Sequence, residues 1–560
     1  MGIGLFSSLR GYRGAWLRSD LLAGLTVWAI LIPESLAYAS IAGVSPVVGL
    51  YAAPGALILY AALGSSRALV VGPMAATAAL SAATVGDLVA HSGGQFLAFT
   101  TGLAITTGVA AALAGLLRLG FLASFISGPV LKGFIVGLAL TIIIGQVPKL
   151  FGIDGGEGDF FRKTVETVGN LGETSGITIL VGGLSLALVL ALKRINTAIP
   201  ASLVAVALGV AAVKIFSLDD HGLAIVGHVD SGLPSLGGHG LRLHDYGTLA
   251  AGGIGVMLVG FAEGLGAAKT YAERDHYEID PNRELLGLDG ANLASGLSGG
   301  MVVNGSLSKT AVNAGAGAKT QLAGLLVAGL TVLTLLFLTG LFEDLPEATL
   351  AAIVIAAVVE LVDFPALRDL WRVYTRQLGF DYGFASRPDF IAAVAAMLGV
   401  LVFDTLPGLF IGIGVALLLL LYRASRPYVA ELGRLPGEAR EFGDLRRHPE
   451  AVSPDGVVAL RIESGLFFAN ADPVRTQITR AADKEGTHAV VLDLESVPSL
   501  DVSSARMLAT VTENLGRSGV ELRLARADGQ VRDVLEKATS SSTPLYPTIV
   551  AAVARKNVTV

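Results

Sequence analysis

Apolar runs of membrane-spanning length recur between residues 20 and 424 of this 560-residue chain. A helix needs about 20 apolar residues to cross the hydrocarbon core of a bilayer, and fewer where it is interrupted. Hydrophobic residues make up 52% of the chain and charged residues only 15%, whereas soluble proteins average about 25% charged residues. The sequence therefore predicts a polytopic α-helical membrane protein, embedded in the lipid bilayer by a transmembrane domain over 20–424. The 14 candidate segments are 20–38, 46–63, 70–90, 96–117, 121–147, 175–192, 198–216, 248–270, 285–300, 305–316, 319–340, 348–362, 389–405 and 408–424.

The positive charges of the loops predict the orientation of these segments. Lysine and arginine concentrate in cytoplasmic loops of membrane proteins. If residues 1–19 form a short cytoplasmic N-terminus, the inner loops hold Arg67, Arg118, Lys193–Arg194 and Arg423–Arg426. We therefore expect a multi-pass protein of a bacterial-type inner or plasma membrane, with both termini in the cytoplasm.

Composition excludes several classes of function. Cysteine is absent, so neither disulfides nor thiolate metal sites are expected. The net charge is −6 and no long basic run is present, which argues against a nucleic-acid partner. The sequence contains no glycine-rich nucleotide-binding loop, no metal-ligand cluster and no catalytic triad, so we expect neither an enzyme nor a bound cofactor.

The two halves of the membrane domain, about 20–216 and 248–424, read as repeats. At an offset of 229, Glu34 falls on Glu263 within a similar pattern of small and apolar residues. At an offset of 233, Gly72 falls on Gly305. Since seven segments per half is an odd number, the two repeats must be inverted relative to each other, as is usual in transporters.

The stretch 298–317 is too polar and too rich in glycine for an ordinary span. We expect extended backbone at Met301–Val303, a turn at Asn304–Gly305 and a short helix over Ser306–Ala314. Non-helical backbone survives at membrane depth only where protein or a water-filled cavity satisfies it. A helix that begins there points free N–H groups at the membrane interior, which suits an anion, and Lys309 adds a positive charge. The alternative is a plain loop between two helices.

The stretch 70–79 mirrors this element in the first half. Gly72–Pro73 interrupts the chain, after which Met74, Ala75 and Ala76 would expose backbone N–H groups. A proline-kinked ordinary span is the alternative. In the second half, Ser306, Leu307, Ser308 and Lys309 would face the same spot, with the two serines either donating hydroxyl hydrogen bonds or capping the helix. Together, these residues of the two interrupted segments form the predicted anion site.

Two acids lie within predicted spans, Glu34 in the first half and Glu263 in the second. An ionised carboxylate at the bilayer centre costs about 2.5–3.5 kcal/mol on insertion scales, so it normally faces a cavity and has a function. These acids are predicted to couple transport to protons, with sodium as the alternative coupling ion. The other reading is a structural ion pair, for example Glu263 with Lys309. Tyr38, one turn after Glu34, either lines the same cavity or packs.

Residues 425–452 are charged and contain prolines, which predicts a linker. From 453 to 560 the chain alternates strand and helix patterns, which indicates a small α/β domain. The expected strands are 456–464, 489–496 and 520–526, and the expected helices are 472–486, 503–519 and 528–539.

The chain resembles the SulP family of anion permeases, known in animals as solute carrier family 26. The resemblance covers nearly the whole chain and depends on the combination of IPESLAYASIAGVSPVVGLYA, SSRALVVGP, NGSLSKTAVNAGAGAKTQLAG and the terminal α/β domain. It implies two inverted seven-span repeats divided into core and gate domains, an elevator-like motion of the core, a homodimer and a cytoplasmic STAS domain. It also implies an anion site at Met74–Ala76 and Ser306–Lys309, beside Glu34 and Tyr38, with Glu263 used for coupling.

Two positions depart from the family pattern. The family often has glutamine where this chain has Glu34, and arginine where it has Lys309. Lysine keeps the charge but loses bidentate geometry, and an acid beside an anion site indicates protonation during transport. In stand-alone relatives of the STAS domain a serine after the aspartate is phosphorylated, which corresponds to Ser503 or Ser504 after Asp501. We expect a serine at this helix start to act as a cap instead.

The leading hypothesis is a secondary active transporter that brings sulfate or a similar small inorganic or carboxylic anion inward with protons. Sodium-coupled bicarbonate transport and proton-coupled dicarboxylate transport are the alternatives. A nucleobase–proton symporter, an uncoupled anion channel and a non-transporting scaffold for the STAS domain are less well supported.

Overall fold

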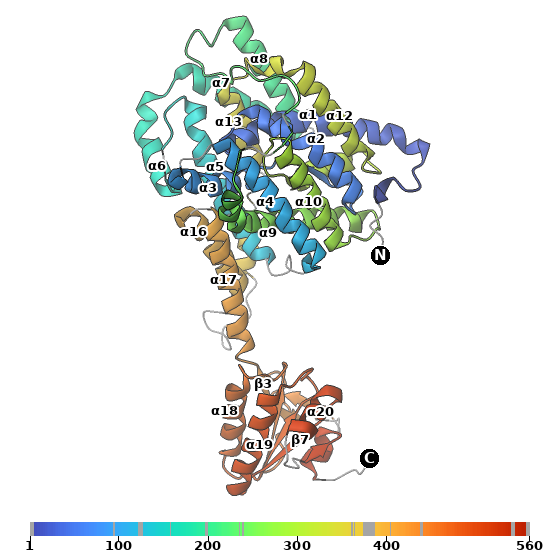
Figure 1. Ribbon diagram of the computed structural model, residues 1–560. Coiled ribbons are helices and arrows are strands. Elements are labelled where there is room, and N and C mark those ends of the chain that lie inside the picture. The colour runs from blue at the N-terminus through green and yellow to red at the C-terminus, as the bar shows by residue number, and fades with distance from the viewer. Residues whose placement is uncertain are drawn as a thin grey trace. The chain divides into compact units, whose positions relative to one another are not determined.

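The computed structural model divides into two compact units, Met1–Arg372 with Asp389–Ala416 and Val373–Pro388 with Leu417–Val560 (Figure 1). We describe each by itself. The structure describes residues 5–92, 96–120, 127–156, 158–195, 200–234, 236–237, 240–359, 362, 364–372, 387–403, 405–436, 441–538 and 544–555. Residues 121–126, the expected start of one predicted span, lie outside this set.

The described part of the chain before the α/β domain is predominantly helical, as predicted. Seven helices in the described part of the chain are long and apolar enough to cross a membrane, and five more are apolar but shorter. The polytopic α-helical fold is thereby confirmed, whereas the count of fourteen crossings stays a prediction. The helices are α1 (Leu17–Ile41), α2 (Pro46–Leu63), α3 (Ala75–Ser92), α4 (Phe96–Leu116), α5 (Gly128–Phe151), α6 (Phe160–Gly169), α7 (Gly176–Ile195), α8 (Ala201–Phe216), α9 (Leu243–Arg274), α10 (Pro281–Leu297), α11 (Leu307–Gly315), α12 (Leu322–Phe337), α13 (Glu347–Val359), α14 (Phe364–Arg372), α16 (Pro388–Phe403) and α17 (Thr405–Ala424).

Glycines let α4 and α10 pack with their backbones close together (Figure 1). A Cβ atom at Gly108 would lie 2.9 Å from the backbone nitrogen of Leu293, and one at Gly296 would lie 2.9 Å from the carbonyl oxygen of Thr101. Small residues at helix interfaces are the usual route to close packing in membranes, where no hydrophobic effect drives helices together.

Two three-residue strands, β1 (Val70–Gly72) and β2 (Asn304–Ser306), join the two halves of the domain. They pair antiparallel, with Val71 opposite Gly305. The expected turn at Asn304–Gly305 is therefore wrong. The Asn-Gly pair is a local turn signal, but the backbone polar groups of this segment are buried in the membrane domain and are satisfied by the other half of the chain.

The second unit contains a six-stranded sheet in the order β4-β3-β5-β6-β7-β8. The three predicted strands are present as β5 (Val457–Ile462), β6 (Ala489–Asp493) and β7 (Glu521–Ala525), which pair in parallel. The three predicted helices are α18 (Ala471–Ala482), α19 (Val502–Arg517) and α20 (Gly529–Ala538), and the short elements β8 (Leu545–Tyr546) and α21 (Ile549–Val553) follow.

The segment 425–452, expected to be a linker, instead contributes β3 (Val429–Arg434) and β4 (Phe442–Asp444) to this sheet. β3 pairs antiparallel with β5 and buries Ala430 and Leu432. The charged residues of β3 alternate with these apolar ones, which is typical of a half-buried strand. The alternation is short, and the charges and prolines around it favour the prediction of a linker instead.

Candidate functional site

Lys309 lies where the two halves of the membrane domain meet. Its backbone nitrogen donates to the side chain of Ser306, the N-cap of α11, at 3.2 Å. Its Nζ donates to the carbonyl oxygen of Pro73 at 3.0 Å and lies 2.8 Å from Oε2 of Glu34. The same ammonium group stands 5.0 Å from the centre of the Tyr38 ring, within cation–π range. The Lys309 side chain is only 1% exposed, so these groups replace its water.

The partner of Lys309 is Glu34, not Glu263 as the ion-pair alternative supposed. Glu34 follows Pro33 in α1, and its side chain is 8% exposed. Nζ of Lys309 and Oε2 of Glu34 form a buried ion pair. Removing one partner of a buried ion pair typically costs about 3–5 kcal/mol, because the other charge is left uncompensated.

The starts of α3 and α11 come together through the β1–β2 pairing and the bond from Lys309 to Pro73. On the first half, Met74 is partly exposed, whereas Ala75 and Ala76 are buried. α11 begins at Leu307, one residue later than expected, because Ser306 is its cap.

The exposed part of this junction lies at the beginning of α11. Leu307 and Ser308 are exposed, whereas Ser306 is buried. The hydroxyl groups of the two serines lie 3.2 Å apart. One of the two predicted serine roles, capping, thus describes Ser306, and the hydroxyl of Ser308 is left beside it at the mouth of the junction.

Glu263 contacts the same junction through β2. The amide nitrogen Nδ2 of Asn304 donates to Oε2 of Glu263 at 3.3 Å. A Cβ atom at Gly305 would lie 2.9 Å from Cα of Gly264, which shows how closely α9 approaches the strand. The two acids predicted from the repeat therefore touch neighbouring residues of one short segment: Glu34 through Lys309, and Glu263 through Asn304.

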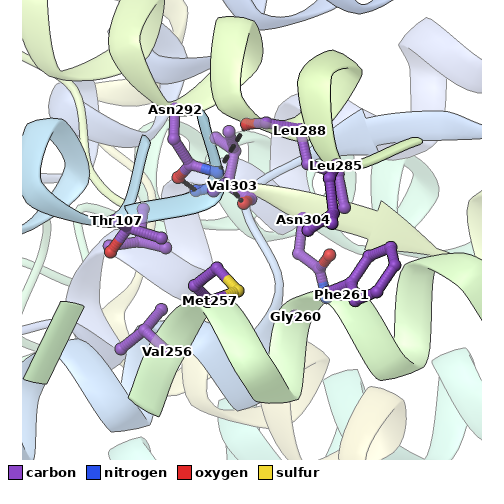
Figure 2. Close-up of a pocket in the computed structure, with 12 residues that line it drawn as sticks. Thr107, Val256, Met257, Gly260, Phe261, Leu285, Leu288, Asn292, Val303 and Asn304 are labelled. Carbon is purple, nitrogen blue, oxygen red and sulfur yellow. Dashed lines mark hydrogen bonds between the residues drawn. The ribbon is translucent and has the colours of Figure 1, made fainter. Parts of the chain in front are cut away.

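A small cavity lies next to β2, between α4, α9 and α10 (Figure 2). Its volume is about 10 Å³, close to the minimum that holds one water. Asn292 stands on its wall: its Nδ2 donates to the carbonyls of Leu288 and Val303 at 3.0 Å each, and its Oδ1 accepts from Val303 N at 3.0 Å (Figure 2).

Sequence reasoning missed Asn292 and Asn304. Both are primary amides inside apolar segments, and this feature could have identified them. An amide without hydrogen-bond partners is costly in a membrane. Asn292 fixes the backbone just before β2, and Asn304 connects β2 to Glu263.

A second, larger cavity of about 310 Å³ contains none of the predicted site residues. It lies between the C-terminal ends of α1 and α5 and the start of α13, and Lys149 and Glu347 line it, 3.8 Å apart. Both side chains are about two-fifths exposed, so this pair is screened by water, unlike that of Lys309.

In the second unit, Asp501 rather than a serine caps α19, so the expected serine cap is wrong. Its Oδ1 accepts from Ser504 N at 2.8 Å and its Oδ2 from Phe468 N at 2.8 Å. Burial raises the pKa of Asp501, but the hydrogen bonds from Ser504 and Phe468 outweigh this effect and leave the pKa below its ordinary value. Ser503 is exposed and Ser504 is buried.

Comparisons with solved structures agree with this fold. The structure of mouse solute carrier 26 family member A9, an anion transporter in the inward-facing state, is 22% identical and superposes with a TM-score of 0.88 over 99% of this chain and 94% of that chain. The transmembrane domain of the cyanobacterial bicarbonate transporter BicA is 23% identical, with a TM-score of 0.61 over 72% of this chain and 98% of that domain.

Comparisons of sequence identify the family. A probable sulfate transporter of Mycobacterium tuberculosis is 34% identical over 532 residues, which cover 95% of this chain and 93% of that protein. Probable sulfate transporter 4.2 of Arabidopsis thaliana is 30% identical over 559 residues, which cover 95% of this chain and 80% of that protein. The sequence profile of the sulfate permease family matches residues 17–380, and that of the STAS domain matches 448–552. The chain therefore belongs to the sulfate permease family of multi-pass membrane anion transporters, is not an enzyme, and carries a STAS domain.

Proposed function

We propose that this chain is a secondary active transporter that brings a small anion, with sulfate as the first candidate, into the cell together with protons. The observation that carries the proposal is the buried pair of Lys309 and Glu34 at the junction of the two halves. Relatives described as sulfate transporters support sulfate as the first substrate to test.

The pair links anion binding to protonation. While Glu34 is ionised, its carboxylate neutralises the charge of Lys309, whose Nζ lies 2.8 Å away. A proton on Glu34 removes this competitor, so an anion can take the place of the carboxylate and receive donors from Lys309 and from the starts of α3 and α11. Each ligand thereby raises the affinity for the other, which is the thermodynamic requirement for coupling.

Glu263 provides the second proton. Without substrate, Lys309 and Glu34 cancel and Glu263 leaves the site with one negative charge. With sulfate bound and both acids protonated, the two charges of sulfate and the one of Lys309 again sum to one negative charge. The loaded and empty core then cross the membrane with the same charge, in an elevator-like motion of the core domain. Sodium at Glu263 is the alternative to this proton.

Bicarbonate and dicarboxylates are the main alternative substrates. A solved neighbour is described as a bicarbonate transporter, and Lys309 lacks the planar fork with which arginine selects an oxyanion geometry. Nucleobase symport and uncoupled conduction are the remaining candidates. We also propose a homodimer in a bacterial-type plasma membrane, with both termini in the cytoplasm.

Uptake into proteoliposomes tests the proposal. Radiolabelled sulfate, bicarbonate, fumarate and uracil are offered with and without pH and sodium gradients, to the wild type and to Glu34→Gln. We expect sulfate uptake driven by an inward proton gradient in the wild type, and a weaker response to the pH gradient in Glu34→Gln, in which only Glu263 still carries a proton. If the uptake of every anion is independent of both gradients, the proposal of coupled transport is overturned. If uracil alone is taken up, the assignment of an anion as substrate is overturned.

A further inference from the structure

Asp289, in the middle of α10, is an acid that the proposed anion cycle does not use. The residue is 9% exposed, and its Oδ1 is buried with no hydrogen-bond partner in the part of the chain that the structure describes. A carboxylate within a membrane normally pairs with a cation or faces water, because its ionised form is otherwise costly. In the ionised form the charge on Oδ1 would have no donor to stabilise it, which favours the neutral acid.

The helices packed against α10 bring no cation to Asp289. α4 lies so close that a Cβ atom at Gly108 would stand 3.1 Å from the carbonyl oxygen of Asp289. The residues of α4, Phe96–Leu116, include no ionisable side chain. The ionisable side chains of α2 are Tyr51 and Tyr60, which are neutral at physiological pH.

The charged groups of α9, α10 and α11 are held elsewhere. On α10, Arg283 donates to two carbonyl groups at the C-terminal end of α2, and Glu284 accepts from a tyrosine and from two successive serines. α9 contributes another acid, Glu263, and its Asp245 accepts from the backbone nitrogen of Arg242. Apart from its tyrosines, the remaining titratable side chains of this helix are exposed, namely His244, Lys269, Glu273 and Arg274. Lys309 of α11 is bound to its own carboxylate and carbonyl partners.

We propose that Asp289 is a further proton-binding site of the membrane domain, separate from Glu34 and Glu263 and occupied in this conformation. A proton taken from water converts the carboxylate to a carboxylic acid, and it leaves again when the carboxyl group gains access to water. The role of this proton in transport rests on the proposed proton coupling, whereas the protonation itself is measured without transport.

Infrared spectroscopy of the full-length protein in lipid nanodiscs at pH 5, which lies above the ordinary aspartate pKa of about 3.9, tests the proposal. The carbonyl stretch of a protonated carboxylic acid is separate from the bands of carboxylates. We expect this band in the wild type, its shift when aspartate is labelled with carbon-13, its loss in Asp289→Asn, and its retention in Glu263→Gln. Asp219→Asn, at an exposed position after α8, is the matched control and leaves the band unchanged.

A spectrum in which carbon-13 aspartate moves no carboxylic acid band would overturn the proposal, and this result needs no variant to fold. An unchanged band in folded Asp289→Asn would also overturn it. Sulfate uptake that ignores the pH gradient in the wild type would defeat the proposed function and leave the infrared result standing. Proton-driven uptake without an aspartic acid band would defeat this inference alone.

Discussion

The ion pair between Lys309 and Glu34 gives the sharpest prediction. In Lys309→Met the Glu34 carboxylate keeps its burial, with a side chain 8% exposed, but loses its partner at 2.8 Å. In Glu34→Gln the ammonium group keeps the Pro73 carbonyl and the Tyr38 ring. We therefore expect Lys309→Met to lower the free energy of unfolding by about 3–5 kcal/mol, and Glu34→Gln to lower it by less.

The double variant distinguishes a direct pair from two separate effects. If the two charges interact, Glu34→Gln with Lys309→Met is less destabilised than the sum of the single variants, by about 1–3 kcal/mol. Thermal unfolding in detergent, followed by intrinsic fluorescence, measures the four proteins side by side. Additive losses would refute the reasoning, because they would mean that the two side chains do not depend on each other.

The same unfolding experiment, repeated with sulfate, measures whether the anion binds each variant. A ligand at about 100 times its dissociation constant stabilises the folded state by about 2.7 kcal/mol. We expect sulfate to stabilise the wild type and Glu34→Gln and to have no such effect on Lys309→Met. Equal stabilisation of Lys309→Met by sulfate would show that the anion binds elsewhere.

Three further predictions concern other contacts, two in the membrane domain and one in the STAS domain. Glu263→Gln should abolish uptake driven by a pH gradient while sulfate binding stays measurable, and normal proton-driven uptake in this variant would reject the role of Glu263. Asn292→Ala leaves the buried N–H and C=O groups of Val303 without partners; each lost partner costs about 1–3 kcal/mol, so the melting temperature should fall well below that of the exposed control Asp219→Asn. Asp501→Ala should lose about 1 kcal/mol of α19 stability, seen as faster hydrogen exchange over the first turn of the helix. Because the pKa of Asp501 is lowered by folding, its contribution is present above its unfolded pKa of about 3.9 and lost as pH falls through the folded value, and exchange that is equally protected at pH 3 and pH 7 would contradict it.

The sequence predicted the main elements of the site but not their partners. The repeat correspondence of Glu34 with Glu263 and of Gly72 with Gly305 identified the interrupted segments, since acids and helix breaks are costly in a membrane and stand out against apolar residues. Which acid would contact Lys309 could not be read from spacing. That choice depends on how α1 and α9 pack against α11, and both acids fit the same local pattern.

The errors have a common cause, which is that local signals were read where distant pairing decides. Asn304–Gly305 has the composition of a turn but pairs with Val71 and Gly72 from the other half of the domain. β3, within the expected linker, is a strand because β5 lies beside it. At α19 both a serine and Asp501 could cap the helix, and the carboxylate at the N-cap position accepts the backbone hydrogen bond.

The pairing of β1 with β2 also restricts how the site can open. α3 and α11 each begin within a few residues of these strands, and Lys309 binds the carbonyl of Pro73 across the junction. Separating the two half-helices would break buried backbone hydrogen bonds, at about 1–3 kcal/mol for each group left without a partner. An anion held between them is therefore released more cheaply when the whole junction moves relative to its surroundings than when it splits. This cost is the physical reason to expect β1, β2, α3 and α11 to move as one body.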